Sequence, residues 1–321
     1  PAPPFITSSL QQEASRKLGF GAKKTMQVAQ KLYEGIDIDG ERIGLITYMR
    51  TDGATLSGDA VDNIRKLIQD KYGKDYLPDI ARVYKSKVKN AQEAHEAIRP
   101  TDVIRKPSDI EQYLDKGQFK IYDLIWKRTI ACQMAHAVME QTSADILAKA
   151  KTSANYMFRA TGQIIKFDGF IRAYTEGQDE KAEDEIEGVL PELSVDEKLK
   201  LHELNPLQHF TEPPPRYTEA TLIRDLEKNE IGRPSTYAPT ISTIQKRGYV
   251  IKEDREGYVR NFNVLTLKKQ KIEEEMKKIE IEKTEDIGFK IQQWEDGQNY
   301  ASEIYFYNLD KKLIYTSSDR K

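Results

Sequence analysis

Hydrophobic residues recur at helical spacing from the N-terminus to about residue 139. A first helix is predicted to end at Gly19, and Ser9 with Gln12 has the pattern of its capping box. The same reasoning predicts further helices that end at Gly35, run from Ser57 to Gly73, cover residues 91–98 ahead of Arg99-Pro100, and cover residues 118–139 as the longest of the set. The first part of the chain is therefore expected to be mainly helical.

Elsewhere the hydrophobic pattern changes to the short runs that favour strands. Residues 42–50, RIGLITYMR, form one such run between two predicted helices. From residue 141 to about 204 the segments ADILAKA, NYMFRATG and IIKFDGFIRAY are rich in strand-forming residues and are bounded by Gly, Asn or Ser. The acidic run at 176–188 interrupts this region, and we expect it to form an exposed loop.

A helical pattern returns after the prolines at 213–215. Thr218 is expected to cap one helix, Gly232 to turn the chain, and Ser235 to begin a second helix. Two helices joined by a tight turn make a helix-turn-helix candidate. Beyond residue 260 the segment KKQKIEEEMKKIEIEK predicts a strongly charged helix, and the Tyr-rich tail that follows carries no recognisable motif.

The composition fits a globular protein with more than one domain. The chain has 321 residues, of which 32% are charged and 38% hydrophobic, whereas single domains usually have about 100–200 residues. No apolar run approaches the roughly 18 residues of a membrane span. Cys132 is the single cysteine, which excludes an internal disulfide and a Cys-rich zinc site. Because the chain begins Pro1-Ala2 without a methionine, we expect a piece of a longer polypeptide.

The net charge of −2 argues against a protein that coats nucleic acid by bulk attraction. Residues 176–188 carry seven acidic side chains and one lysine, so they contribute −6 and leave +4 on the remainder. That remainder can form a basic groove. A candidate rim comprises Arg82, Lys85, Lys87 and Lys89, although the same run also suits a solvated loop.

Tyr48, Arg50 and Asp52 are the first candidates for chemistry. On a strand their side chains would share one face, since side chains alternate with period two. A phenol has an ordinary pKa of about 10 and is a poor nucleophile at neutral pH, but a nearby guanidinium stabilises both a phenolate and the charge on an attacked phosphate. Arg50 could bind phosphate oxygens in a bidentate way. The pattern also suits a half-buried aromatic beside a surface cation.

His95 and Arg99 are four residues apart in QEAHEAIRP, so on a helix they would face the same side. Such a pair suits a phosphate, because a histidine can donate a hydrogen bond to it or transfer a proton near pH 7. The alternative is a surface histidine beside Glu96. The remaining histidines show no spacing typical of metal ligands, and these are His136, His202 and His209.

The segment IGRPSTYAP has the features of an anion site. Gly232 permits close backbone approach, Arg233 supplies charge, and Ser235 with Thr236 places hydroxyls and N–H groups at the start of a helix. The alternative is an ordinary helix cap that binds nothing. Further candidates on the same unit are Arg216, Tyr217 and Arg247.

Five segments, in this order, resemble the bacterial type IA DNA topoisomerase family over about residues 4–255. They are PFITSSLQQEASRKLGFGAKKTMQVAQKLYEG, GLITYMRTDG, AQEAHEAIRPTD, YDLIWKRTIACQM and TEPPPRYTEATLIRDLEKNEIGRPSTYAPTISTIQKRGYV. The resemblance implies that Tyr48 forms a 5′-phosphotyrosyl link with a cut single strand and that Arg50 assists cleavage. It also implies that His95 and Asp52 belong to the active site. Arg233, Ser235 and Thr236 match a segment that contacts the DNA backbone.

The resemblance implies an α+β multidomain fold that forms part of a ring of domains. The domains would be an arch entry at 1–7, a helical tyrosine domain at 8–136, a strand-rich arch at 137–206 and a helix-turn-helix base at 207–260. Residues 261–321, with the charged helix, stay unassigned. Movement of the tyrosine domain away from the base would open a gate for a DNA strand.

Members of this family hold Mg²⁺ on an acidic cluster of an N-terminal Toprim domain, and no such cluster is found in this sequence. This chain is therefore expected to bind no metal itself and to be inactive, or nearly so, alone. The expected partner is single-stranded or negatively supercoiled DNA, bound by a monomer in the cytoplasm at the nucleoid, without a membrane.

The sequence thus predicts a type IA topoisomerase that cuts single-stranded DNA with Tyr48, passes a strand and rejoins the cut without ATP to relax negative supercoils. The alternative is a non-catalytic module that binds single-stranded nucleic acid with the helix-turn-helix and the basic loop. A tyrosine recombinase is disfavoured, because its tyrosine normally follows the arginine and histidine positions, whereas here Tyr48 comes first.

Overall fold

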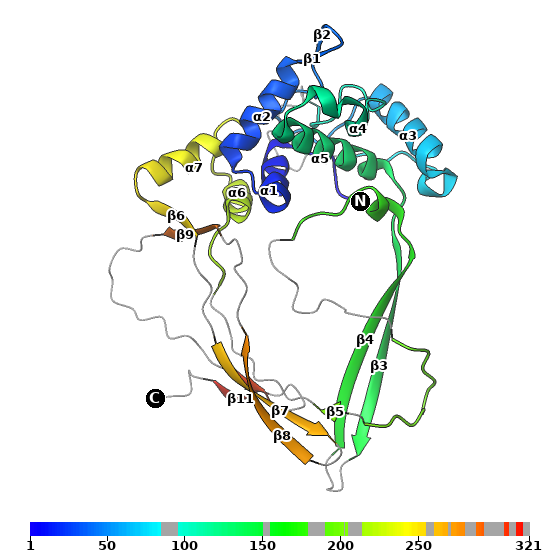
Figure 1. Cartoon of the computed structure of the whole chain (residues 1–321). Coiled ribbons are helices and arrows are strands. Elements are labelled where there is room, and N and C mark those ends of the chain that lie inside the picture. Colours follow the sequence, from blue (N-terminus) through cyan, green and yellow to red (C-terminus); the bar gives the residue numbers. More distant parts are fainter. Residues whose placement is uncertain are drawn as a thin grey trace. The chain divides into compact units, whose positions relative to one another are not determined.

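A computed structural model describes residues 1–84, 96–149, 155–178, 190–201, 203–204 and 214–254, together with the strands 260–268, 271–279, 287–291, 305–307 and 313–316. The chain divides into two units (Figure 1). The first comprises Pro1–Met139, Ile165–Glu183 and Tyr217–Val250, and the second comprises Glu140–Ile164, Asp184–Arg216 and Ile251–Lys321. The domain boundaries inferred from the resemblance stay a prediction.

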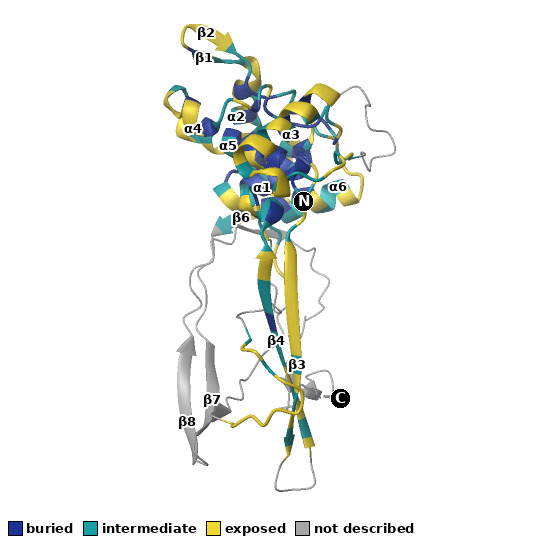
Figure 2. Ribbon diagram, turned by 90° about the vertical axis from the view of Figure 1, so that its right-hand side faces the viewer, coloured by how far each residue is buried: buried dark blue, intermediate teal, exposed yellow. Residues whose placement is uncertain are grey.

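The first unit is helical, as the hydrophobic spacing predicts. Buried residues concentrate in its helices (Figure 2), and the helix α5 buries Ile121, Tyr122 and Ile125 completely. The α-helices are α1 (Thr7–Leu18), α2 (Ala22–Glu34), α3 (Gly58–Tyr72), α4 (Pro107–Ile110), α5 (Lys116–Gln133), α6 (Glu219–Lys228) and α7 (Tyr237–Lys246), and the 3₁₀ turns are η1 (Lys74–Tyr76), η2 (Glu111–Tyr113) and η3 (Gly169–Arg172).

The beginning of α1 differs from its prediction. The Ile6 N–H donates to the Ser9 hydroxyl at 3.0 Å, so the helix is capped at Ile6 and not at Ser9. The predicted Ser9 and Gln12 capping box is therefore wrong by one helical turn. The shift places Thr7 and Ser8 inside the first turn, where both are buried.

The end of α5 also differs from its prediction. Asp115 caps this helix through the N–H groups of Gly117 and Gln118, each at 2.8 Å. The helix ends at Gln133, earlier than the predicted residue 139, because the Met134 N–H turns back to the Ala131 carbonyl and a strand follows.

The segment 42–50 is not the continuous strand that its apolar run predicts. Only a short hairpin forms, from β1 (Ile36–Ile38) and β2 (Glu41–Ile43). After it the backbone bonds to segments outside any sheet: the Leu45 N–H donates to Leu32 O, and the Thr47 N–H to Arg99 O. These tertiary hydrogen bonds replace the strand ladder.

The helix predicted at 91–98 is contradicted where the structure describes it. Residues 91–95 lie outside the described part of the chain. Ile98 forms an isolated β-bridge with Phe5, and the N–H groups of Ala97 and Ile98 donate to Thr55 O at 2.9 Å and Phe5 O at 2.8 Å. Pro100 follows closely and disfavours the helical region for the residue before it. No helix therefore joins His95 to Arg99 in the described residues.

Two of the predicted strand segments, 144–150 and 155–162, coincide with strands where the structure describes them, whereas the third, 164–174, leaves the strand at Phe167 and forms η3. β3 (Val138–Lys149) pairs with β4 (Asn155–Phe167), and each strand has its first or last residues in the helical unit. In a three-stranded sheet, β7 (Arg260–Lys268) lies between β5 (Glu203–Leu204) and β8 (Lys271–Ile279). The other pairs are β6 (Val250–Asp254) with β9 (Ile287–Ile291) and β10 (Tyr305–Tyr307) with β11 (Leu313–Thr316). The chain is thus α+β.

The strongly charged helix predicted beyond residue 260 is wrong. β7 and β8 pair antiparallel over nine positions, from Arg260 with Ile279 to Lys268 with Lys271. Strand β7 is rich in strand-forming residues, and its backbone groups form hydrogen bonds with β8. Such pairing overrides the helical preference of Lys and Glu.

The structure describes only part of the acidic run and only part of the chain in which a membrane-spanning helix could be sought. In the acidic run, residues 179–188 lie outside the described part, whereas Glu176 forms an ion pair of 2.7 Å with Arg128 and the Gly177 N–H bonds to Glu13. Among the helices that are described, none has the length and apolar character needed to cross a membrane.

Candidate active site and nucleic-acid interface

Tyr48 lies in an irregular segment whose side chains alternate between core and surface. Met49 and Thr51 are buried, with exposed fractions of 0% and 2%. Arg50, which lies between these two residues, is exposed. Tyr48 and Asp52, which flank them, are half-buried. The burial alternation expected of a strand is therefore present although the strand is not. Tyr48, Arg50 and Asp52 are each less buried than Met49 and Thr51, and the Tyr48 side chain packs against the core.

A single buried threonine holds this segment from the first turn of α1. The Thr7 hydroxyl lies 2.8 Å from Met49 O and 3.0 Å from Thr51 O, and it accepts the Thr51 N–H at 2.8 Å. The Thr7 N–H also donates to Thr51 O at 3.0 Å. These bonds fix the backbone on both sides of Arg50. The sequence reasoning missed Thr7 because its partners lie more than 40 positions away in the chain.

We predict that Thr7→Val destabilises the full-length protein by about 1–3 kcal/mol, because it leaves the buried Thr51 N–H without its partner while it preserves the side-chain shape. Urea unfolding would measure the difference. Thr7→Ser is the control, since it retains the hydroxyl. Equal losses in the two variants would assign the effect to packing and not to these hydrogen bonds.

Aromatic and polar contacts hold the other side of Tyr48. Its ring meets the ring of Tyr33, at the end of α2, with centroids 5.4 Å apart and an edge-on angle of 67°. The neighbouring Thr47 donates its hydroxyl to Ala97 O at 2.7 Å and accepts the Arg99 N–H at 3.0 Å. The ITYMRTD and HEAIRP motifs thus lie side by side, although His95 itself is outside the described residues.

Arg99 is engaged within the chain. Its guanidinium donates to Glu96 Oε2 at 2.7 and 3.0 Å and to Pro100 O at 2.9 Å. Glu96 Oε1 in turn accepts the Ser57 N–H at the start of α3, at 2.8 Å. These contacts suit a residue that positions the motif. That Arg99 binds DNA stays a prediction.

The turn between α6 and α7 is tight and exposed. The Arg233 N–H donates to the Thr236 hydroxyl at 2.7 Å, and the Thr236 N–H donates back to Arg233 O at 2.8 Å. Gly232 has φ of 84°, and a Cβ there would lie 3.0 Å from the Thr236 hydroxyl. α7 begins at Tyr237, slightly later than the predicted Ser235. Arg233, Ser235 and Thr236 are all exposed.

The electrostatics around Tyr237 connect this turn to the Tyr48 segment. Burial raises the pKa of the Tyr237 hydroxyl, the carboxylates of Glu227 and Asp52 raise it further, and the Arg233 guanidinium lowers it. Asp52 of the ITYMRTD motif and Arg233 of the IGRPSTYAP motif therefore lie in one electrostatic neighbourhood. Sequence reasoning named both residues but had no means to place them together.

The remaining candidates are the basic rim at 82–89 and the residues Arg216, Tyr217 and Arg247 of the helix-turn-helix region. Lys85, Lys87 and Lys89 lie outside the described residues. Arg82 bonds to Gln133, Met134 O and His136. Arg247 is exposed at the opposite end of α7 from Thr236, Tyr217 donates to Asp225, and Arg216 is exposed in the second unit.

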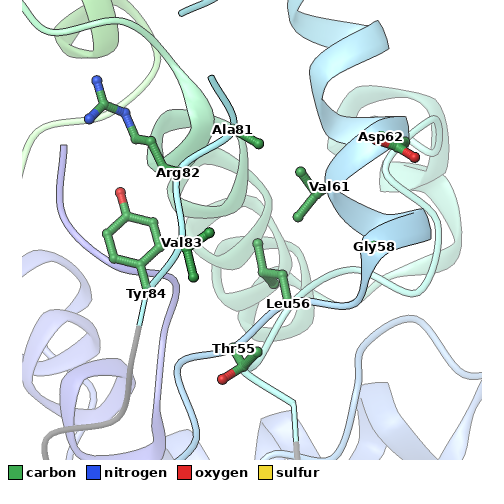
Figure 3. Close-up of a pocket in the computed structure, with 9 residues that line it drawn as sticks. All are labelled: Thr55, Leu56, Gly58, Val61, Asp62, Ala81, Arg82, Val83 and Tyr84. Carbon is green, nitrogen blue, oxygen red and sulfur yellow. The ribbon is translucent and has the colours of Figure 1, made fainter. Parts of the chain in front are cut away.

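A hollow of about 230 Å³ lies between residues 55–62 and 81–84 (Figure 3), where Leu56, Val61 and Val83 give it a mostly apolar lining. Tyr48 is not among its lining residues. Within the described ranges, no group of three or more His, Cys, Asp and Glu side chains could hold a metal ion.

Known proteins resemble this chain along most of its length. A profile of the family described as DNA topoisomerase matches residues 1–293. The DNA topoisomerase 1 of Rickettsia bellii is 60% identical over 255 residues, which are 79% of this chain and 31% of that protein. The DNA topoisomerase 1 of Xylella fastidiosa is 53% identical over 258 residues, again 79% of this chain and 31% of the relative.

Among solved structures, full-length topoisomerase I from Thermotoga maritima aligns with a TM-score of 0.62 and 36% identity, over 80% of this chain and 40% of that one. The chain therefore spans about a third of the length of the curated relatives that it matches.

Proposed function

Since this chain belongs to the family of bacterial type IA DNA topoisomerases, we propose that it carries the tyrosine with which such an enzyme cuts and rejoins one DNA strand. The Tyr48 oxygen attacks the phosphorus of a phosphodiester, and the bond from phosphorus to the 3′ oxygen breaks. The phenol loses its proton, the 3′ oxygen gains one, and the 5′ phosphate stays on Tyr48. Because one ester replaces another, rejoining needs no ATP.

The observation that carries this proposal is the alternation at residues 48–52. Thr7 fixes the backbone there, so the half-buried Tyr48 and the exposed Arg50 extend from a segment that is held in place by contacts within the chain. Such preorganisation lowers the cost of placing a guanidinium beside an attacked phosphate. We assign His95 to the same phosphate, with Asp52 as the acidic neighbour.

The metal ion that the family implies does not fit the described residues, which offer no group of ligands for it. No step proposed here runs through a metal ion. We propose that a Toprim domain supplies Mg²⁺, so this chain alone should form little or no covalent adduct.

We propose single-stranded or negatively supercoiled DNA of the nucleoid as the partner, bound by one copy of the protein. The exposed turn of Arg233, Ser235 and Thr236 would contact its backbone close to Asp52. During strand passage, α6 and α7 would separate from the tyrosine-bearing helices. Passage of a DNA strand through this opening would relax the DNA.

The polarity of the covalent link tests the reaction. The full-length protein with Mg²⁺ is incubated with an oligonucleotide labelled at its 3′ end or at its 5′ end, and the mixture is denatured. The 3′-labelled strand should become protein-bound, whereas the 5′-labelled product should be released. Adduct on the 5′ label would contradict a 5′-phosphotyrosine, and no adduct on either would favour the non-catalytic alternative.

Arg233→Ala should weaken binding of single-stranded DNA to a similar degree across sequences and lower the log–log slope of affinity against salt by about 0.7, as expected for one lost phosphate contact. Fluorescence anisotropy at several salt concentrations measures both. Lys120→Ala, at an exposed lysine on α5, is the control. An unchanged slope for Arg233→Ala would remove this turn from the DNA interface, in either candidate function.

A further inference from the structure

Helix α6 packs against α1, and α7 packs beside α2 (Figure 1). The buried apolar side chains are Ala220 and Ile223 in α6 and Tyr237 and Ile241 in α7. What distinguishes the contact is a carboxylate at each end of α6 that bonds to the other pair of helices.

The first carboxylate is Glu219, the first residue of α6. It is 6% exposed, and its Oε2 accepts the N–H of Ala22, the first residue of α2, at 2.7 Å. The N-cap of α2 is Gly21, which has no side chain to cap the helix. Glu219 therefore caps α2 from another helix, where its negative charge also meets the positive end of the helix dipole.

Gly21 fits this arrangement closely. A Cβ at this position would lie 2.9 Å from both carboxylate oxygens of Glu219, which is too near for either to stay. The glycine thus leaves the space that the carboxylate occupies.

The second carboxylate is Glu227, in the last turn of α6. Its Oε1 accepts the hydroxyl of the buried Ser8 at 2.7 Å. Eight residues of helix separate the two glutamates, or about 12 Å. Both ends of α6 are therefore bonded, one to α2 and one to α1.

The position of Ser8 links this contact to the nucleophile. Ser8 follows Thr7, which holds the backbone on both sides of Arg50. One turn of α1 thus binds the Tyr48 segment and, through the next residue, α6. Glu227 also raises the pKa of Tyr237, beside Arg233. The contact joins the two halves of the candidate site.

We propose that Glu219 and Glu227 form a latch that holds α6 and α7 against the tyrosine-bearing helices and sets how often the two separate. This inference rests on the proposed function, in which the separation opens the gate. A closed latch keeps the 5′ phosphate on Tyr48 close to the free 3′ hydroxyl between cleavage and rejoining.

The test measures distance and not cleavage. Fluorophores are attached through unnatural amino acids at Lys31 on α2 and Lys246 on α7, both exposed, in the full-length protein. Single-molecule energy transfer should show Glu219→Gln raising the fraction of separated molecules at least fivefold, although it preserves the shape of the side chain. Gly21→Ala should act in the same direction from the opposite side of the contact.

Glu111→Gln, at an exposed glutamate in η2, is the matched control and should leave the distance distribution unchanged. If Glu219→Gln fails to fold, Ser8→Ala provides a milder variant, for which a smaller rise is expected. Unchanged fractions in folded Glu219→Gln, Gly21→Ala and Ser8→Ala would overturn the latch. The outcome is separable from the proposed function, because the distance readout does not require Tyr48 to cut DNA.

Discussion

Tyr48→Phe should lower covalent adduct formation by at least about 1000-fold, because the variant lacks the oxygen that attacks phosphorus. The measurement uses the full-length protein with Mg²⁺ and a 3′-labelled oligonucleotide, and it follows the labelled protein band after denaturation. The Tyr48 ring is half-buried against Tyr33, and phenylalanine preserves that packing. DNA binding should therefore stay close to that of the unchanged protein.

Tyr33→Phe is the matched control, since it removes a hydroxyl from the ring that touches Tyr48 and leaves the proposed nucleophile intact. We expect its adduct yield to fall by no more than a few fold. A comparable loss in both variants would mean that the Tyr33 hydroxyl also takes part in cleavage, since phenylalanine preserves the packing of either ring. An adduct that persists in Tyr48→Phe would remove Tyr48 as the nucleophile, whichever residue replaces it.

Local sequence signals predicted most of the helical unit. Glycines at the ends of α1, α2 and α3, and Thr218 before α6, sit where the chain must leave or enter a helix, and such signals depend on a few neighbouring residues. The errors lie where distant contacts decide. The apolar run at 42–50 has the composition of a strand, yet Thr47 bonds to Ala97 and Arg99 instead of a sheet.

The same distinction applies to the site. Tyr48, Arg50, Asp52 and Arg233 could be named from their types and motifs. The residues that position them could not be named, because their partners are distant in the sequence. Thr7 bonds to Thr51 across 44 positions of the sequence, Glu219 to Ala22 across 197 positions and Ser8 to Glu227 across 219 positions. A serine or glutamate in the first turn of a helix is common, so nothing in the local pattern shows that its partner is another helix.

Arg50 differs from the other arginines of the candidate site in what surrounds it. Arg99 donates three hydrogen bonds within the chain, and Arg233 lies on a turn that contributes to strand binding in our proposal. Arg50 is exposed between two buried residues, and Thr7 fixes the backbone on either side. This geometry suits a side chain that stabilises charge on phosphorus during attack and contributes less to holding the strand.

Arg50→Ala should therefore slow cleavage by about 100–1000-fold, the usual loss when a preorganised donor to transition-state charge is removed, with a much smaller effect on DNA affinity. The cleavage rate of Arg50→Lys should lie between the rates of the unchanged protein and of Arg50→Ala, because lysine retains the charge and loses bidentate geometry. Single-turnover cleavage of the 3′-labelled oligonucleotide gives the rate, and anisotropy gives the affinity. Arg42→Ala, at an exposed arginine in β2, is the control. A loss of affinity as large as the loss of rate would make Arg50 a strand-binding residue.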